Sequence, residues 1–143
     1  MKCKDGVVIA SEKLIHSVLL QDGCNARVNH VETYAGLVYN GRIPDGRHLL
    51  NRARMECQEY SKVYNVPMSG KLIANRISLY MHAHSLYGQY RPFGSGVILA
   101  SKEDDKYGLY MISPSGECLV YQINLISGIP CLCSRKRKTT SKN

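Results

Sequence analysis

The sequence lacks the long apolar run that a membrane-spanning helix needs. Its longest apolar stretches are only a few residues long, whereas a helix that crosses a bilayer takes about 20 residues. The start of the chain, Met1 to Asp5, also lacks the apolar segment of a secretory signal. These absences argue against a membrane partner and predict a soluble intracellular protein.

The sequence also lacks the C-x-x-C pairs that usually announce a zinc site. Its six cysteines are scattered, and the closest couple, Cys131 and Cys133, is separated by a single residue. Such residues are expected to be reduced thiols that pack as small apolar side chains. There is no glycine-rich phosphate loop either, so no metal ion and no cofactor are predicted.

Threonine is scarce, and none lies near the start of the chain. The three threonines are Thr33, Thr139 and Thr140. Hydrolases that attack with an N-terminal threonine use the free amine of that residue as the base for its own hydroxyl. A threonine-type hydrolase is therefore the disfavoured alternative. Ser95 offers no replacement, because a nucleophile elbow precedes a helix, whereas the helix expected here comes before Ser95.

The histidines do not form a catalytic or metal-binding pattern. His82 and His84 are two residues apart, which points them to different faces of a helix, whereas helical metal pairs prefer a spacing of four. His84 lies on an apolar stripe and is expected to be a core residue. His16, His30 and His48 have no clustered partners. We therefore predict no catalytic residue.

The net charge of +8 is concentrated at the end of the chain. Five basic residues lie in the last nine positions, so the rest of the chain carries 8 − 5 = +3. That modest charge does not favour nucleic acid as a partner. A basic-tailed nuclear or nucleic-acid-associated protein remains the second alternative, because the run could serve as an import signal. The five residues are Arg135, Lys136, Arg137, Lys138 and Lys142.

Hydrophobic periodicity predicts strands followed by two helices. The apolar run at 6–10 indicates a buried strand, and 27–39 indicates two strands that meet near Thr33. A helix is predicted over 45–64, with Asp45 as its N-cap. Its apolar stripe consists of Leu49, Ala53, Cys57, Tyr60 and Tyr64.

A second helix is predicted from Ser69, its N-cap, to Tyr87, before Pro92. Strands are then expected at 96–100, 108–112 and 118–121, with a turn at 114–116. Strands, two helices and again strands indicate an α+β layered sandwich and not alternating βαβ units.

Three short blocks carry a family resemblance. They read GRIPDGRHL at 41–49, RPFG at 91–94 and LYMISPSG at 109–116, supported by KDGVV at 4–8 and AHSLY at 83–87. In this order and spacing they resemble the alpha-type subunits of the proteasome core particle, closest to the lineage called type 3 in one naming scheme and type 7 in another. The motif residues expected to be structural are Asp45, Arg47, Arg91, Pro92, Phe93, Gly94, Pro114 and Gly116.

The resemblance runs from Lys2 to about Tyr121 and implies a fold. Relatives of this kind form the αββα sandwich of N-terminal-nucleophile hydrolases, here incomplete because the first helix and the C-terminal helices are missing. Residues 1–122 are expected to form a partial alpha-subunit domain, and residues 123–143 a divergent, disordered basic tail. One face of the strands at 97–100 and 109–112 should then lack helical cover.

The resemblance also implies a function. It points to a non-catalytic structural subunit of the alpha ring that supports ubiquitin-dependent protein degradation in cytoplasm and nucleus. The expected partners are neighbouring alpha subunits, beta subunits, and the C-termini of regulatory or activator particles. The two helices match those that face the beta ring.

Two residues match a binding pocket of the family. Arg27 lies where many alpha subunits carry a lysine that lines the pocket for the activator's C-terminal carboxylate. Gly41 matches a glycine of the same pocket, where the missing side chain lets the bound backbone approach. An ordinary exposed strand arginine explains Arg27 equally well.

Overall fold

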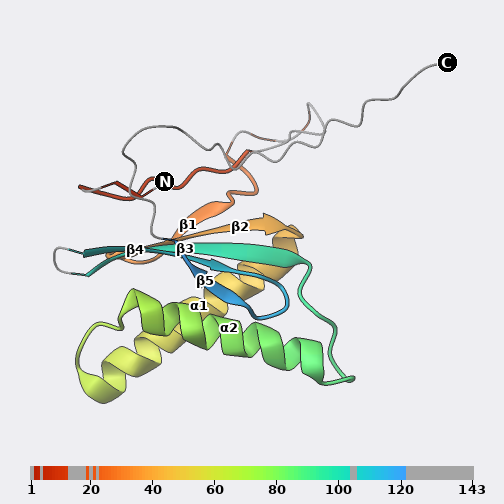
Figure 1. Ribbon diagram of the computed structural model, residues 1–143. Coiled ribbons are helices and arrows are strands. Elements are labelled where there is room, and N and C mark those ends of the chain that lie inside the picture. The colour runs from red at the N-terminus through yellow and green to blue at the C-terminus, as the bar shows by residue number, and fades with distance from the viewer. Residues whose placement is uncertain are drawn as a thin grey trace.

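In the part of the chain that it describes, a computed structural model shows one antiparallel sheet with helices packed on one of its faces (Figure 1). The residues it describes are 2–3, 5–12, 19, 21, 23–103 and 106–121. Their elements are β1 (Val28–Glu32), β2 (Ala35–Gly41), α1 (Ile43–Tyr64), α2 (Gly70–Leu86), β3 (Ser95–Glu103), β4 (Lys106–Ile112) and β5 (Cys118–Val120). Neither α1 nor α2 is long and apolar enough to cross a bilayer.

The five described strands follow one another across the sheet in chain order, and every neighbouring pair is antiparallel. Both described helices lie between β2 and β3 in the chain, yet these two strands pair directly, with Leu37 opposite Leu99. The α+β arrangement and the order of strands and helices predicted from the sequence are confirmed at this level. The strand expected at 118–121 is present as β5.

The core lies between the sheet and the two helices. Because side chains alternate along a strand, Leu37 and Tyr39 of β2 face the same side as Leu99 of β3 and Ile112 of β4, and all four are at most 1% exposed. The apolar stripes of α1 and α2 cover them with side chains such as Leu49. Tyr64 at the end of the predicted stripe is instead 60% exposed.

The start of α1 differs from the prediction. The helix begins at Ile43 and its N-cap is Arg42, which makes no side-chain capping bond, so Asp45 is the third helical residue and the prediction of an Asp45 N-cap is wrong. Pro44 fits the first turn because its missing N–H has no intrahelical partner there. The prediction for α2 is confirmed, because the Ser69 hydroxyl accepts a hydrogen bond from the backbone N–H of Leu72 at 3.4 Å.

The prediction of a buried strand at 6–10 is wrong. In the described part of this segment the only pairing is an isolated bridge between Lys2 and Val7, and the side chain of Val8 is 63% exposed. The segment lies across the face of the sheet that points away from the helices. Ile9 Cδ1 approaches Gly36, and the Ser11 hydroxyl donates to Asn40 Oδ1 at 2.9 Å. An apolar run becomes a strand only where a sheet edge is available to pair with it.

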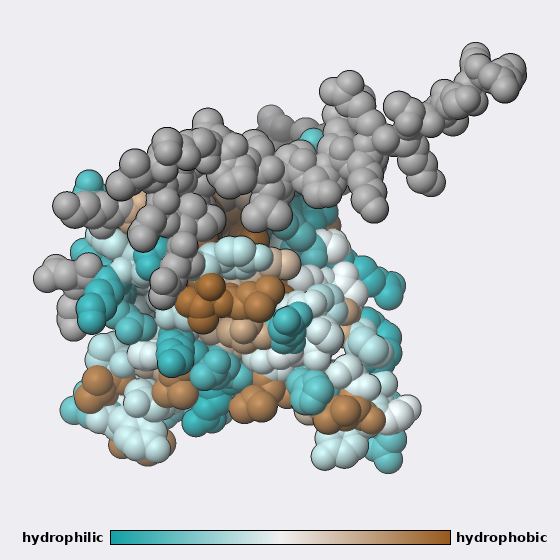
Figure 2. Space-filling view, in the orientation of Figure 1, coloured by the Kyte–Doolittle hydropathy of each residue, from teal (hydrophilic) through white to brown (hydrophobic). Residues whose placement is uncertain are grey.

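The face of the sheet away from the helices is apolar as well. Val38, Ala100 and Leu109 are buried there, whereas Met111 is 38% exposed and Leu119 is 43% exposed. Figure 2 shows apolar side chains gathered at the β5 edge of the sheet, next to this face. Neither α1 nor α2 covers this face, because both lie on the opposite one (Figure 1).

Candidate functional site

The pairing of β1 with β2 brings the two predicted pocket residues together. The Arg27 guanidinium donates from Nη1 to the carbonyl oxygen of Gly41 at 3.5 Å, although the residues are 14 positions apart in the chain. The Arg27 carbonyl in turn accepts from the backbone N–H of Tyr39 at 3.2 Å. Arg27 is half-buried, so its cationic head lies at the surface beside the end of β2.

Gly41 occupies a crowded junction between β2, α1 and β3. Its φ is +114°, a conformation that L side chains rarely adopt, and a Cβ atom here would lie 2.3 Å from the Gly94 carbonyl oxygen. The same Gly94 oxygen accepts from the backbone N–H of Arg42 at 3.0 Å. The packing of the chain against itself therefore accounts for the glycine at this position.

Asp45 holds the segment after α2 against the start of α1. Its carboxylate accepts from both terminal nitrogens of Arg91, at 2.8 and 2.9 Å, and from the backbone N–H of Gly94 at 2.9 Å. The hydrogen bonds from Arg91, followed by that from Gly94, hold the pKa of Asp45 well below its usual value. A buried carboxylate with this set of donors is a structural clamp.

Pro92 and Phe93 follow Arg91 in the chain, and the Phe93 ring lies in an aromatic cluster. Phe93 is 8% exposed, and its ring centroid lies 4.7 Å from that of His84 and 5.8 Å from those of His48 and Tyr80. His84, expected to be a core residue, is instead half-buried at the edge of the core, and its Nδ1 lies 2.9 Å from the Tyr80 carbonyl oxygen. His48, for which the sequence showed no catalytic or metal-binding partner, lies in this aromatic cluster beside Tyr80 and Phe93.

The turn between β4 and β5 packs on α2. Gly116 has a φ of +89°, its carbonyl oxygen accepts from the Ser78 hydroxyl, and a Cβ atom here would lie 2.4 Å from His82 Cβ. His82 Nδ1 lies 3.0 Å from the carbonyl oxygen of Ser115. Pro114 precedes Gly116 in the turn that was predicted at 114–116. The contacts of Ser115 and Gly116 thus hold this turn against α2.

Arg47, the remaining motif residue, lies beside a shallow polar pocket of about 390 Å³. Its Nη2 donates to Asn25 Oδ1 at 3.1 Å. Across the same pocket the Arg54 guanidinium donates to the carbonyl oxygen of His30 at 2.8 Å from Nη2. Both arginines join α1 to the β1 end of the sheet.

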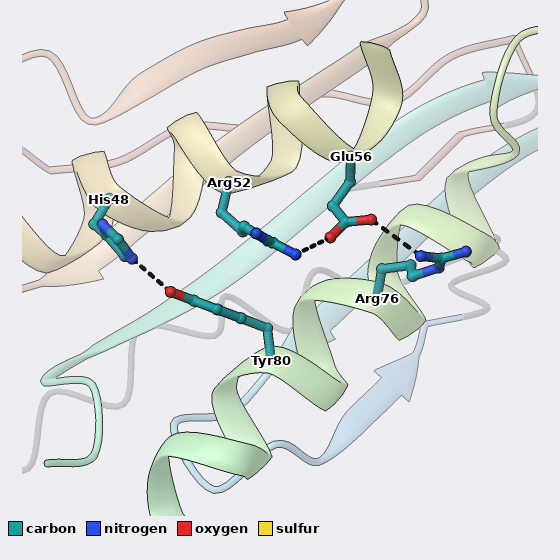
Figure 3. A network of polar contacts seen from close by, with 5 residues as sticks. All are labelled: His48, Arg52, Glu56, Arg76 and Tyr80. Carbon is teal, nitrogen blue, oxygen red and sulfur yellow. Dashed lines mark hydrogen bonds and ion pairs between the residues drawn. The ribbon is translucent and has the colours of Figure 1, made fainter. Parts of the chain in front are cut away.

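A second polar network links α1 to α2 (Figure 3). The buried carboxylate of Glu56 accepts from Arg52 on its own helix and from Arg76 Nη1 on α2 at 3.1 Å. Arg52 also lies over the ring of Tyr80, 5.0 Å from its centroid, and His48 Nε2 lies 2.8 Å from the Tyr80 hydroxyl. The sequence reasoning did not find this network, although His48, Arg52 and Glu56 recur at the four-residue spacing that places side chains on one helix face.

The described residues offer little for bond-breaking chemistry. No group of three or more histidine, cysteine, aspartate or glutamate side chains in the described ranges could hold a metal ion. Burial raises the pKa of Cys57 to about 11, and burial also raises the pKa of Cys118, so both thiols stay protonated near neutral pH. Thr33 lies exposed in the turn between β1 and β2. The arrangement presents cationic side chains on a rigid scaffold, which suits docking.

Comparison with known proteins finds the same family over nearly the whole chain. The family model described as "Proteasome subunit" matches residues 1–127. The chain is 44% identical to "Proteasome subunit alpha type-3" of Oryza sativa subsp. japonica over 121 residues, which cover 85% of this chain and 49% of that protein. It is 43% identical to "Probable proteasome subunit alpha type-7" of Saccharomyces cerevisiae, with 85% of this chain and 42% of that protein covered.

The similarity extends to an archaeal protein. "Proteasome subunit alpha" of Pyrococcus abyssi is 37% identical over 116 residues, which cover 81% of this chain and 44% of that protein. The chain thus spans about half the length of the curated relatives it matches. The alpha type-3 and type-7 names agree with the lineage that the sequence blocks resemble.

Proposed function

Because this chain belongs to the proteasome subunit family, we propose that it is a non-catalytic structural subunit of the alpha ring of the proteasome core particle and supports ubiquitin-dependent protein degradation. The observation that carries the proposal is the 42–44% identity to alpha type-3 and type-7 subunits over 85% of the chain. These relatives do not favour a threonine-type hydrolase or a nucleic-acid-associated protein.

The proposed partners are the neighbouring alpha and beta subunits. The helix pair supports docking because it carries apolar side chains that stay exposed, among them Met55 at 50% and Leu79 at 66%. The face of the sheet away from the helices carries Met111 and Leu119, which supports a second sheet packed on it as in an αββα sandwich. In this proposal residues 1–122 form the alpha-subunit domain, residues 123–143 form a basic tail, and the protein acts in cytoplasm and nucleus.

Co-assembly tests the proposed function. The chain, produced together with the other subunits of the core particle, is expected to co-migrate with the ring assembly on native gels and in sedimentation. The chain purified alone is expected to show no peptidase activity above that of a buffer blank. A chain that stays monomeric beside abundant rings, or that cleaves peptides without companions, contradicts the proposal.

We further propose that Arg27, beside Gly41, binds the C-terminal carboxylate of activator subunits. Support comes from the Arg27 guanidinium, whose one hydrogen bond within the described part of the chain is a 3.5 Å contact to the Gly41 carbonyl oxygen. A charge-assisted hydrogen bond is worth about 1.5 to 3 kcal/mol. Arg27→Ala is therefore expected to weaken binding of an activator C-terminal peptide to the assembled ring by at least about tenfold.

Two variants make this measurement specific. Arg27→Lys keeps the charge and should retain most of the peptide affinity. Lys62→Ala removes an exposed cation from the last turn of α1 and should leave the affinity unchanged. Fluorescence anisotropy with a labelled peptide measures all three, and equal affinities of Arg27→Ala and the unaltered chain would reject the role of Arg27.

A further inference from the structure

We propose that the outer surface of the α1–α2 pair docks an acidic segment of a neighbouring subunit, whose carboxylate binds between Arg52 and Arg76. The identity of the partner as a subunit of the same particle rests on the proposed function. The chemistry of the partner, an acidic side chain flanked by apolar ones, is inferred from the charges and exposures of these two helices.

The two arginines are held at the surface by one buried acid. Glu56 has a side chain that is 9% exposed and accepts from both Arg52 and Arg76, whose side chains remain 37% and 49% exposed. Figure 3 shows the three side chains meeting in the space between α1 and α2. Each guanidinium has five donors, and each donates one hydrogen bond to Glu56 from a terminal nitrogen, so donors remain for a further acceptor.

The network carries an unbalanced positive charge. Two guanidinium groups against one carboxylate leave a net charge of +1 between the helices. From Ile43 to Leu86 the chain has six basic and three acidic residues, and two of the three acids, Asp45 and Glu56, are already in ion pairs. A second carboxylate, supplied by a partner, would balance the charge of the network.

The arginines are also fixed in position before a partner arrives. Arg52 lies over the Tyr80 ring, and the Tyr80 hydroxyl lies within hydrogen-bonding distance of His48. Because Glu56 and Tyr80 limit the rotamers of Arg52, binding a carboxylate loses less side-chain entropy than it would with a free surface arginine. A cation held in this way is typical of the anchor residues of protein interfaces.

The apolar flank distinguishes a protein partner from a nucleic acid. Met55 lies three residues after Arg52 on α1, and Leu79 lies three residues after Arg76 on α2, so each pair shares one side of its helix. Met55 is 50% exposed and Leu79 is 66% exposed. Arginine together with exposed methionine and leucine suits an acidic protein surface, whereas a phosphate backbone favours rows of cations without apolar contacts.

Substitution of Arg76 tests the proposal in co-assembly with the other core subunits. Arg76→Gln removes the charge and leaves Glu56 paired with Arg52, so the fold should persist; thermal unfolding of the purified variant checks this. At about 0.15 M salt the assembled fraction of Arg76→Gln is expected to fall at least about tenfold relative to the unaltered chain. Lys71→Gln, which removes an exposed cation from the first turn of α2, should change it less than about twofold.

The outcomes of this experiment separate the two proposals. If the unaltered chain assembles and Arg76→Gln assembles equally well, or if Lys71→Gln loses as much as Arg76→Gln, the acidic docking site is wrong and the structural role stands. If the unaltered chain does not assemble, the proposed function fails and the docking proposal fails with it.

A photo-crosslinker placed at Leu79 identifies the partner without disturbing the network. This side chain is exposed, so its replacement should not affect folding. Peptide mapping of the crosslinked product is expected to find a segment of a neighbouring subunit with an aspartate or glutamate within about one helical turn of the attachment point. A crosslinked segment without an acid, or crosslinking to nucleic acid instead, overturns the proposal.

Discussion

Asp45→Ala is expected to lower the free energy of unfolding at neutral pH by about 2 to 3 kcal/mol. The carboxylate is 7% exposed and accepts three hydrogen bonds, two from Arg91 and one from the backbone N–H of Gly94. Its loss leaves the Gly94 N–H without its acceptor. The effect stays below that of a fully buried ion pair, because the Arg91 side chain is 61% exposed and can be hydrated when the carboxylate is removed.

The pH dependence of stability gives this prediction a second readout. The pKa of Asp45 is lowered in the folded protein, first by the Arg91 hydrogen bonds and then by the Gly94 N–H. Such a carboxylate stabilises the fold above its unfolded pKa of about 3.9, and this contribution is lost as the pH falls through the lower folded pKa. The stability difference between the unaltered chain and Asp45→Ala should therefore be constant from about pH 5 to about pH 8 and shrink below about pH 4.

Urea unfolding at several pH values measures both effects. Glu59→Gln is the matched control, because Glu59 is an exposed carboxylate on the same helix, and it should change the free energy of unfolding by less than about 0.5 kcal/mol. Equal stabilities of Asp45→Ala and Glu59→Gln at neutral pH, or a difference that does not shrink in acid, would show that the clamp contributes nothing.

Asp45 also shows where sequence reasoning reaches its limit. An aspartate at the start of a helical pattern is typical of an N-cap, but this local rule placed the N-cap at Asp45, three residues after the observed N-cap, Arg42. The Asp45 carboxylate instead accepts hydrogen bonds from Arg91, which is 46 positions away in the chain. No local sequence pattern predicts such a distant pairing. The N-cap rule does hold for Ser69, because the partner of its hydroxyl, the backbone N–H of Leu72, is only three residues away.

The contrast between local patterns and contacts distant in the chain also applies to the other elements of the fold. The two helices and the strands at 96–100 and 108–112 follow from periodicity, because each repeats its apolar face over several residues. The run at 6–10 has the composition of a strand, but the composition of a segment does not determine whether another strand pairs with it. In the helix network, Arg52 and Glu56 are visible as an i, i+4 pair, whereas Arg76 joins them only through the packing of α2 on α1.

The sequence identified the motif residues, but it did not give the physical reason for each of them. The blocks at 41–49, 91–94 and 109–116 drew attention to Asp45, Phe93 and Gly116 as family motifs, and the structure supplies the physical reason for each in its contacts. The reason for Gly41 could not be derived from the sequence. A glycine at the end of a strand fits an open approach for a ligand as well as it fits crowding by the chain itself.

Gly41→Ala is expected to lower the free energy of unfolding by about 2 to 6 kcal/mol, the sum of two costs. A φ of +114° is strained for any residue with a Cβ atom, which costs of order 1 to 3 kcal/mol. The added methyl group would also lie 2.3 Å from the Gly94 carbonyl oxygen and 2.9 Å from Ser95 Cα, and such overpacking typically costs about 1 to 3 kcal/mol. Both neighbouring atoms belong to the backbone, so no side chain can turn aside to make room.

Relief of this clash would have to open the junction of β2, α1 and β3. Amide hydrogen exchange should therefore show lost protection at Arg42 and Gly94, whose N–H groups bond to Gly94 O and to Asp45. Gly88→Ala is the control, since a Cβ atom at Gly88 meets nothing within 4 Å, and its stability should change by less than about 0.5 kcal/mol. If Gly41→Ala unfolds like Gly88→Ala but the assembled ring loses activator-peptide binding, the glycine is needed by the ligand and the packing argument for it is wrong.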